Sequence, residues 1–565
     1  MQVSRLHKRL MPESRAIVKT HRSGTDSPPR SPASAEEVSR AASAWAPLRH
    51  PVFRGVWTAS FASGIGTWMQ NVGAAWLMSS LAASPMMVAL IQSATSFPAF
   101  LLALPAGALA DVVDRRRLLL FTQGWMLLAA TLLGVLTLGG MTTSWVLLAL
   151  TFAIGVGAAM NSPAWQAILP EMVPARDLRP AVALNAMSMN LARALGPALA
   201  GLVIAATSAG LVFLLNALSF LGVMLVLYRW RSEPRPSSLP TERTVGAIRA
   251  GLRYVRHAQP LRAVLWRTGA FILFGSILWA LLPVLSRNLG LGSTGYGALL
   301  GCFGIGAVAG GMFLPKLCHR RSTDSLLGAA TVLLAAVILG LAYVSSFVGL
   351  CLVMVIGGLA WIVIMSSLNA AAQTAVPGWV RARALAVYQL VFQGGVALGS
   401  ALWGAVASRF DLPTAFLAAS FGLILGLVLT SRFRLEAGES LDLTPSLHWP
   451  EPTIIIEPSP DDGPVLVMVE YCIDPQQASE FALAMQVLRV IRLRDGGTNW
   501  GLYQDSSDVS RVVETFVVES WAEHQRQHER VTRSDRAVEE AVRSFHQGEG
   551  PKVSHLFYLR GSRKP

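Results

Sequence analysis

Long apolar runs follow one another from about residue 55 to residue 431, separated by short polar or charged segments. Each run has about the 20 residues that an α-helix needs to cross the hydrocarbon core of a bilayer. The pattern therefore predicts an all-α polytopic membrane protein with twelve transmembrane helices. The predicted spans are residues 55–81, 86–110, 117–139, 145–169, 181–206, 211–230, 265–287, 295–318, 325–343, 348–372, 382–407 and 413–431.

Positive charge is distributed unevenly between the loops that join these spans. Eighteen Lys and Arg residues lie in the loops that follow even-numbered spans, whereas only Arg287 and Arg409 lie in the loops that follow odd-numbered spans. Basic loops are retained on the cytoplasmic side of a membrane. We therefore expect a multi-pass protein of the cytoplasmic (inner) membrane with both chain ends in the cytoplasm.

Two parts of the membrane region resemble each other. The segment "NSPAWQAILPEMV" at 161–173 recurs as "NAAAQTAVPGWV" at 369–380. Repeats of this kind are typical of transporters built from two related halves. The sequence predicts two six-helix pseudo-repeats, residues 49–230 and 265–434, joined by residues 231–264. This linker is basic and amphipathic, and we expect it at the cytoplasmic membrane surface.

The two ends of the chain differ in composition from the membrane region. Residues 1–48 are rich in Ser, Arg, Pro and Ala, which predicts a disordered, basic cytoplasmic tail. A Pro- and Glu-rich linker spans residues 435–463. Over residues 464–560, strand and helix patterns then alternate in the order βαββαβ. This order predicts a small cytoplasmic α+β domain of the ferredoxin-like type.

The composition agrees with a membrane transporter and argues against several other classes. The chain is 53% hydrophobic and 14% charged, whereas soluble proteins carry about 25% charged residues. Its basic residues gather in the cytoplasmic loops, so we expect a bilayer as partner and no nucleic acid. The chain has no phosphate-binding loop that ends in Lys-Ser or Lys-Thr, which argues against an ATP-driven pump. Its four cysteines form no Cys-x-x-Cys pair, and we expect neither metal nor cofactor.

Polar side chains inside the spans are the candidates for a small-molecule pathway, because such groups are costly in hydrocarbon and usually face the bundle interior. Asn369 and Gln373 are spaced i, i+4 and so share one helix face. Arg193 is the one charge well inside a span, and it can pair with an anionic substrate, with backbone carbonyls or with the membrane surface. The alternative for the amides is that they only hold helices together. The candidates are Gln70, Asn71, Gln92, Asn161, Asn190, Arg193, Asn369, Gln373, Gln389 and Gln393.

The segment "PAGALADVVDRRRLLL" at residues 105–120 concentrates charge between the second and third spans. It resembles the loop motif of the major facilitator superfamily, Gly-x-x-x-Asp-basic-x-Gly-basic-basic. Gly107, Asp111, Arg115 and Arg116 fall on this pattern. A valine and an aspartate stand where a basic residue and a glycine are usual.

A second segment, "ARALGPALAG", resembles the Gly-Pro motif of exporters in this superfamily through Gly196, Pro197 and Gly201. The chain is most similar to the enterobactin-exporter-like permeases, also called transmembrane secretion effectors, over about residues 48–560. The resemblance implies export of a small amphipathic molecule, siderophore-like or drug-like, by alternating access. It also implies a conformational latch between the halves, for which Asp111 and Arg115 are the candidates. Asp111 can pair with Arg115, four residues on, or face the positive end of a neighbouring helix.

Proton coupling is a further implication of the resemblance. Proton-coupled transporters commonly carry the proton on a buried carboxylate. No Asp or Glu lies inside any of the twelve predicted spans. The sequence therefore identifies no proton carrier.

The C-terminal domain resembles small dimeric α+β barrel domains, which include cofactor-free monooxygenases. His524 and His528 are spaced i, i+4, which suits a metal or a catalytic role, and His546 and His555 lie nearby in the sequence. No third ligand is evident and the segment is dense in Arg, Glu and Gln, which favours a solvated helix face. We expect this domain to act in dimerisation or regulation.

Two hypotheses of function follow. The first is a secondary-active exporter that is not an enzyme. The alternative is a membrane-anchored sensor or enzyme whose active part is the C-terminal domain. The repeats, the intramembrane amides and the loop motif favour the exporter.

Overall fold

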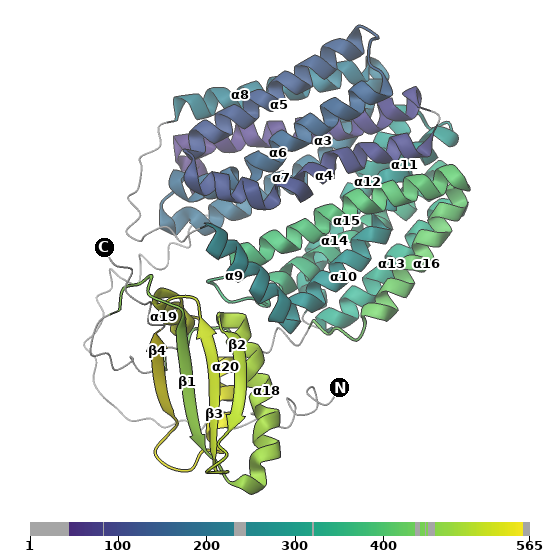
Figure 1. Cartoon of the computed structure of the whole chain (residues 1–565). Coiled ribbons are helices and arrows are strands. Elements are labelled where there is room, and N and C mark those ends of the chain that lie inside the picture. Colours follow the sequence, from purple (N-terminus) through teal and green to yellow (C-terminus); the bar gives the residue numbers. More distant parts are fainter. Residues whose placement is uncertain are drawn as a thin grey trace, which may run out of the picture.

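The computed structural model describes residues 45–82, 84–230, 244–318, 321–435, 441–446, 448–449 and 458–557. The predicted N-terminal tail lies almost wholly outside the described residues, and so do parts of both predicted linkers. Figure 1 shows a large helical bundle and, beneath it, a small domain built on a β-sheet.

Six long helices form the N-terminal half of the bundle. Short polar residues start several of them: the carboxylate of Asp114 accepts a hydrogen bond from the backbone N–H of Arg117 at 2.8 Å and so caps α5. The turn after α5 contains Gly140 at φ +68°, a conformation that other residues rarely adopt. The helices are α3 (Pro51–Leu81), α4 (Pro85–Val112), α5 (Arg115–Leu138), α6 (Ser144–Met172), α7 (Leu178–Ala206) and α8 (Ala209–Arg229), with one-turn helices η1 (Ala46–Arg49) and η2 (Ala175–Asp177) before α3 and α7.

The C-terminal half repeats this arrangement after the connecting helix α9 (Thr244–His257). One predicted span is broken, because α10 ends at Gly275 and α11 begins at Ile277. The carbonyl oxygen of Leu273, next to this break, accepts a hydrogen bond from the indole nitrogen of Trp403 at 2.8 Å. The helices are α10 (Gln259–Gly275), α11 (Ile277–Asn288), α12 (Gly292–Cys318), α13 (Thr323–Tyr343), α14 (Phe347–Thr374), α15 (Arg381–Arg409) and α16 (Leu412–Thr430).

The helices match the predicted spans closely in position. Among the described residues, eleven helical segments are long and apolar enough to cross a membrane, with α10 and α11 forming one of them. The remaining predicted span, residues 55–81, corresponds to α3, which is 31 residues long but carries more polar side chains. It packs between α7 and α8 inside the bundle. The all-α polytopic fold is therefore confirmed.

The two ends of the bundle differ in what they carry. We call the end that bears α9 and the C-terminal domain the linker end, and the opposite end, which holds the turns after α3, α5, α7, α11, α13 and α15, the distal end. Each half begins and ends at the linker end, and its successive helices alternate in direction between the two ends. All five predicted basic loops that the helices bracket lie at the linker end.

The two halves meet along a seam made by two helix pairs, α4 with α15 and α7 with α12. Glycine permits the close approach of α7 and α12, because a Cβ added at Gly201 would lie 2.8 Å from the carbonyl oxygen of Ser293 and 3.0 Å from the Cα of Gly297. At the distal end of the other pair, the hydroxyls of Ser84 and Ser408 lie 3.3 Å apart. The halves are therefore in direct contact at the distal end.

The seam opens towards the linker end. Between α7 and α12 the close contacts continue to Ala194 and Gly304, near the middle of both helices. Further towards the linker end, the same faces of the two helices carry Met187 on α7 and Met312 on α12, which are 53% and 74% exposed. Exposed positions on the continuation of a contact stripe indicate that the helices diverge there.

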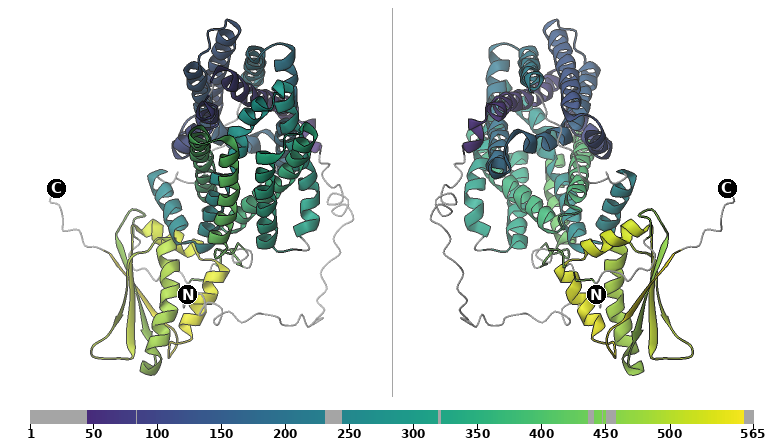
Figure 2. Two further views of the ribbon diagram at one scale, coloured as in Figure 1. Left: turned by 90° about the vertical axis from the view of Figure 1, so that its right-hand side faces the viewer. Right: turned by 90° about the vertical axis from the view of Figure 1, so that its left-hand side faces the viewer.

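The C-terminal domain has a four-stranded antiparallel sheet in the order β2-β3-β1-β4. This strand order and the βαββαβ succession confirm the ferredoxin-like α+β domain. Helices cover one face of the sheet (Figure 2), and alternate residues of β1, beginning with Val465, are buried beneath them. The elements are β1 (Val465–Cys472), η3 (Pro475–Gln477), α18 (Ala478–Asp495), β2 (Thr498–Gln504), β3 (Arg511–Val518), α19 (Trp521–Arg530), α20 (Arg533–Arg543) and β4 (Lys552–Phe557).

The glycine contact at the seam predicts the effect of one added methyl group. Gly201→Ala should force α7 and α12 apart, with an overpacking cost of about 1–3 kcal/mol, and loosen the distal end. Cysteines at positions 84 and 408, in a chain without its native cysteines, should then form a disulfide more slowly than in the parent. Gly222→Ala is the matched control, since nothing lies within 4 Å of a Cβ added there. Equal cross-linking in the Gly201→Ala and control chains would contradict this role of the seam.

Candidate functional site

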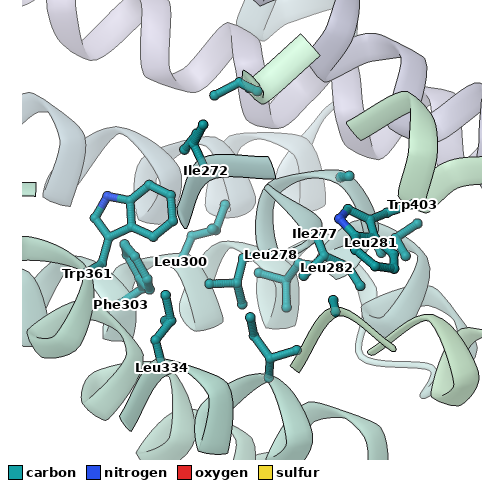
Figure 3. Packing of buried hydrophobic residues seen from close by; sticks show 14 of the residues in the cluster. Ile272, Ile277, Leu278, Leu281, Leu282, Leu300, Phe303, Leu334, Trp361 and Trp403 are labelled. Atoms are coloured by element: carbon teal, nitrogen blue, oxygen red, sulfur yellow. The ribbon is translucent and has the colours of Figure 1, made fainter. Parts of the chain in front are cut away.

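Aromatic rings from both halves meet at mid-depth in the bundle. The rings of Trp68 on α3 and Trp279 on α11 lie 6.2 Å apart across the seam. Trp279 in turn lies 5.2 Å from Phe303 and 5.6 Å from Trp361. Figure 3 shows Phe303 and Trp361 side by side among aliphatic side chains. Trp68 and Trp279 are half-buried, so this central aromatic cluster presents indole surface where the two halves meet.

Arg193 lies against this central aromatic cluster. Its guanidinium carbon is 5.3 Å from the centre of the Trp68 ring, a cation–π arrangement. The side chain is half-buried, and its Nε is fully buried with no hydrogen-bond partner among the described residues. A guanidinium beside indole rings can bind an anion and stack on a flat group.

Two of the predicted pathway amides are used in helix packing within the N-terminal half. Gln70 is 4% exposed, and its amide oxygen accepts a hydrogen bond from the amide of Asn216 on α8. Asn161 on α6 accepts hydrogen bonds from Thr122 at 3.0 Å and Gln123 at 3.4 Å, both on α5. The structure places both amides between helices of one half, away from the seam, because their partners on neighbouring helices hold them there.

Other predicted amides are more accessible. Gln373 donates a hydrogen bond to Asn369 at 3.0 Å, and both side chains are exposed, so the predicted shared face exists. Asn190 is exposed and donates to the carbonyl of Ala186 in its own helix. The remaining candidates lie on α3, α4 and α15: Asn71, Gln92 and Gln393 are half-buried, and Gln389 is exposed.

The charged segment at residues 105–120 makes contacts within the N-terminal half. Arg115 binds Glu171, at the end of α6, at 2.6 Å. Arg116 donates to the carbonyl oxygens of Leu227 at 3.0 Å and Tyr228 at 2.5 Å, where α8 ends, a favourable place for a cation. The side chain of Asp111 lies outside the described residues, so its pairing with Arg115 stays a prediction. Gly107 lies in open space, with nothing within 4 Å of an added Cβ.

The exporter-type motif on α7 lies on the helix's packing faces. A Cβ added at Gly196 would lie 2.5 Å from the Cβ of Trp68, so the glycine brings α7 against α3 beside the central aromatic cluster. The carbonyl of Pro197 and the backbone of Gly201 approach Gly297 across the seam. The motif thus joins the contact within one half to the contact between the halves.

A cation at the distal end was not among the predicted site residues. Arg287, at the end of α11, donates to the carbonyl oxygens of Ser79 and, at 3.2 Å, Ala82, where α3 ends. This contact links the C-terminal half to the N-terminal half. A signal was present in the sequence, because Arg287 is one of two basic residues in the distal loops.

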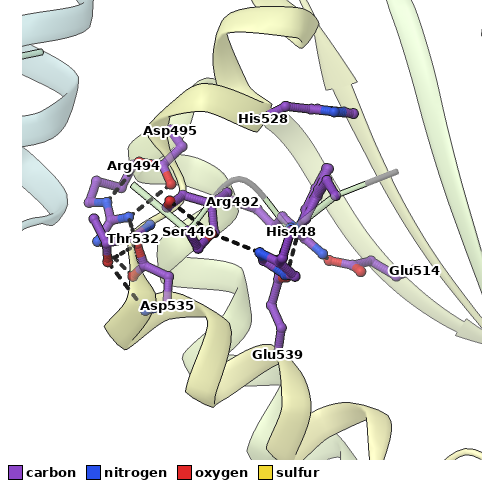
Figure 4. Close-up of polar contacts among 12 residues, drawn as sticks. Ser446, His448, Arg492, Arg494, Asp495, Glu514, His528, Thr532, Asp535 and Glu539 are labelled. Carbon is purple, nitrogen blue, oxygen red and sulfur yellow. Dashed lines mark hydrogen bonds and ion pairs between the residues drawn. The ribbon is translucent and has the colours of Figure 1, made fainter. Parts of the chain in front are cut away.

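A buried network of charges forms the interior of the C-terminal domain (Figure 4). The guanidinium of Arg492 binds Glu539 at 2.7 Å and Glu514 at 3.3 Å, and all three side chains are at most 5% exposed. His448 and Trp449, from the segment before β1, each donate to Glu539 at 2.8 Å. Burial alone would raise the pKa of Glu539, but Arg492 and these donors outweigh it and hold the pKa at about 2.

The histidines of α19 are not on a solvated face, contrary to prediction. His524 is fully buried, its Nε2 lies 3.2 Å from Nε2 of His528, and its ring lies 4.7 Å from that of His555. The reason is that Trp449 covers this side of the helix, with its ring 4.5 Å from that of His528. Burial lowers the pKa of His524 to about 3 and that of His528 to about 4. Among the described residues, no group of three or more His, Cys, Asp or Glu side chains is arranged to hold a metal ion.

The sequence of the chain is similar to those of known membrane transporters. The profile of the transmembrane secretion effector family matches residues 42–563. The enterobactin exporter EntS of Escherichia coli O1:K1 is 25% identical over 385 residues, 67% of this chain and 91% of that protein. The staphyloferrin A transporter of Staphylococcus aureus is 25% identical over 295 residues, 51% of this chain and 72% of that protein.

Solved structures share the fold of the bundle. A bacterial homologue of the human lysosomal transporter Spinster, in an inward-facing and unoccupied conformation, gives a TM-score of 0.55 at 14% identity. The match covers 70% of this chain and 97% of that one. The nucleoside transporter NupG gives a TM-score of 0.51 at 13% identity, over 69% of this chain and 99% of that one.

The buried histidines predict a pH dependence. Their folded-state pKa values lie below the ordinary value of about 6.5, so the unfolded domain takes up protons that the folded domain does not. Stability of the C-terminal domain should be complete above about pH 6.5 and fall as the pH drops towards 4, by about tenfold in the folding equilibrium per histidine and per pH unit.

Hydrogen exchange of β1 and α18 in the full chain, corrected for intrinsic rates, measures this loss. A chain with both His524→Phe and His528→Phe retains rings at these positions and cannot titrate there. It should show a flatter pH dependence. An unchanged slope in that chain would show that other groups cause the loss.

Proposed function

Because the chain belongs to the transmembrane secretion effector family of the major facilitator superfamily, we propose that it exports a siderophore-like amphipathic molecule across the cytoplasmic membrane by alternating access. The names of the enterobactin exporter and the staphyloferrin A transporter support the substrate class. In alternating access, two halves rock about a site near the bilayer midplane. The central aromatic cluster with Arg193 is the observation that carries this proposal.

The seam between the halves is closed at one end of the bundle and open at the other, which indicates the end from which a substrate would enter. The halves touch at the distal end and diverge at the linker end, so the mid-depth cluster is reached from the linker end. We propose that the linker end faces the cytoplasm, because the basic loops gather there. The structure then corresponds to the state that loads a substrate from the cytoplasm.

The chemistry of the central cluster fits an anionic molecule with planar groups. In a site of low dielectric, the guanidinium of Arg193 attracts an anion more strongly than it would in water. The indoles of Trp68 and Trp279 offer flat apolar surface on both sides of the seam. Rocking would separate these two indoles, so a substrate between them would be released as the distal end opens.

Arg287 has the geometry of a gate at the distal end. Its hydrogen bonds to the last carbonyls of α3 must break before the distal end can open. A charge-assisted bond of this kind stabilises the closed arrangement by about 1.5–3 kcal/mol. It would therefore set how often the distal end opens.

Proton coupling and dimerisation extend the proposal. Because the predicted spans contain no carboxylate away from the helix ends, the candidate acceptors for a coupling proton lie at helix ends, where Glu171 pairs with Arg115 and Asp324 pairs with Arg267. For dimerisation, the uncovered face of the sheet offers the surface (Figure 2), since apolar side chains of β1 and β3 point away from the helices there. These side chains are Leu466, Met468, Val513 and Val517.

A strain deleted for the gene tests the export function. Untargeted metabolomics should find a siderophore-like compound enriched in the deleted cells and depleted from their medium, and the intact gene should reverse both changes. The Arg193→Ala chain should reach the membrane normally but restore export about tenfold less well, because the cation–π and anion contacts are lost. Arg193→Lys, which keeps the charge, should retain part of the activity. If no compound moves between cells and medium, the export proposal fails.

Removal of the distal gate makes a separate prediction. Arg287→Ala should raise the rate at which an impermeant maleimide labels a cysteine at position 293 from outside the cell, by about tenfold. Ser293 is 9% exposed beside Gly201, so labelling requires the distal end to open. Arg409→Ala, at the other basic position of this end, is the matched control. Equal labelling in the two variants would show that Arg287 is not a gate.

A further inference from the structure

The C-terminal domain docks on the linker end of the C-terminal half. The contact centres on Trp379, in the turn between α14 and α15. One side of its indole meets the ring of Tyr254 on α9, with the ring centres 5.7 Å apart. The guanidinium carbon of Arg530, from α19 of the C-terminal domain, lies 4.5 Å from the Trp379 ring. Trp379 is therefore held between α9 and the domain.

A charged cluster fastens this contact. Glu523 on α19 binds Arg253 on α9 at 2.9 Å and Arg530 at 2.6 Å. The side chains of Arg253 and Glu523 are only 16% and 13% exposed. Arg526 adds a third guanidinium at 3.7 Å. The carboxylate of Glu523 thus lies among three guanidiniums, and its pairs with Arg253 and Arg530 are largely shielded from water.

The electrostatics of Glu523 agree with this role. Burial alone would raise its pKa, but the hydrogen bonds and charges of Arg530 and Arg253 outweigh that effect and keep the pKa below its ordinary value. A second cation of the domain, Arg494, lies 5.7 Å from the ring of Tyr254 on the same surface of α9. The contacts of the docked domain therefore favour an ionised Glu523.

The docked turn continues directly into a seam helix. Beneath Trp379, side chains of α9, of the start of α10, of the turn and of the start of α15 form a small apolar cluster that packs these segments together: Tyr254, Ala258, Leu261, Val376, Val380 and Ala384. From there α15 runs to Gly394, where an added Cβ would lie 2.7 Å from the ring of Phe100 on α4. The part of α15 before Gly394 is the part that must approach α4 when the linker end closes.

We propose that the docked C-terminal domain is a brake that holds the start of α15 in place and so opposes closure of the linker end. This inference rests on the alternating access proposed above. Release of the domain would leave the turn supported only from within the bundle, by α9 and the start of α10, and let α15 move towards α4. Transport would then be tuned by the charge balance around Glu523.

Glu523→Gln tests the brake. The variant removes the carboxylate that Arg253 and Arg530 share, so two neighbouring guanidiniums lose a common anionic partner at a shielded interface, which is costly. Docking is measured as the distance between spin labels at Leu252 on α9 and Leu483 on α18, both about half exposed in the docked chain. Closure is measured in the same way between Met187 and Met312, in full-length chains whose native cysteines have been replaced.

Glu519→Gln is the matched control. Glu519 precedes α19 by two residues and pairs with Arg249 on the same α9, but at 3.5 Å and with side chains 70% and 64% exposed. An exposed pair contributes little. Its loss should leave both distance distributions as in the parent chain.

In Glu523→Gln, we expect the 252–483 distances to broaden and the fraction of short 187–312 distances to rise by about fivefold or more, the size of a typical coupling between sites. If the domain is released and the 187–312 distances do not change, the brake is refuted, because docking of the domain then has no effect on closure of the linker end. If neither Glu523→Gln nor the charge reversal Glu523→Lys releases the domain, this cluster does not fasten it, and the proposal is equally refuted.

These distances require no substrate. A failure of the export test together with a positive distance result would therefore leave the brake intact and remove only the proposed cargo and direction.

Discussion

The architecture of the bundle depends on how closely helices from the two halves can approach each other. In a membrane, lipid tails are as apolar as the helix surfaces, so hydrophobic burial does not drive helix association and packing of small residues must do so. Gly201 and Gly297 supply that packing where α7 crosses α12, with backbone atoms at contact distance. The close contact extends from the distal end to the middle of both helices, at Ala194 and Gly304, and beyond it the same helix faces carry methionines. The closed distal end and the open linker end follow from this distribution of side-chain size.

Much of the fold could be predicted from the sequence, because the signals are local. Hydropathy places each span to within a few residues, since every helix in hydrocarbon must satisfy its own backbone hydrogen bonds. The period-2 and period-3.6 patterns of residues 464–560 predicted the succession βαββαβ of the C-terminal domain, because these patterns are local as well. The break between α10 and α11 was not predictable, because it is stabilised by Trp403, which lies 130 residues away from Leu273.

The candidate site was predictable only in part. Arg193 stood out because a charge inside an apolar run is rare. The partners of the amides did not, since Gln70 meets Asn216 and Asn161 meets Thr122 only after the helices have packed. The burial of His524 was hidden for a similar reason. After Trp521 and Ala522 the sequence of α19 is polar at every position. The residue that covers it, Trp449, comes from the linker before the domain.

The break at Ser276 has a consequence for the path between the two end states. The carbonyl of Leu273 at this break is already bound by an indole from another helix and by the hydroxyl of Ser276. A bend there requires no new unsatisfied carbonyl in hydrocarbon. The part of this span nearer the distal end is α11, which carries Trp279 and Arg287. This helix can therefore tilt while α10 stays in place. A two-part span of this kind allows an occluded intermediate, in which a bound molecule is sealed from both sides of the membrane before either end opens.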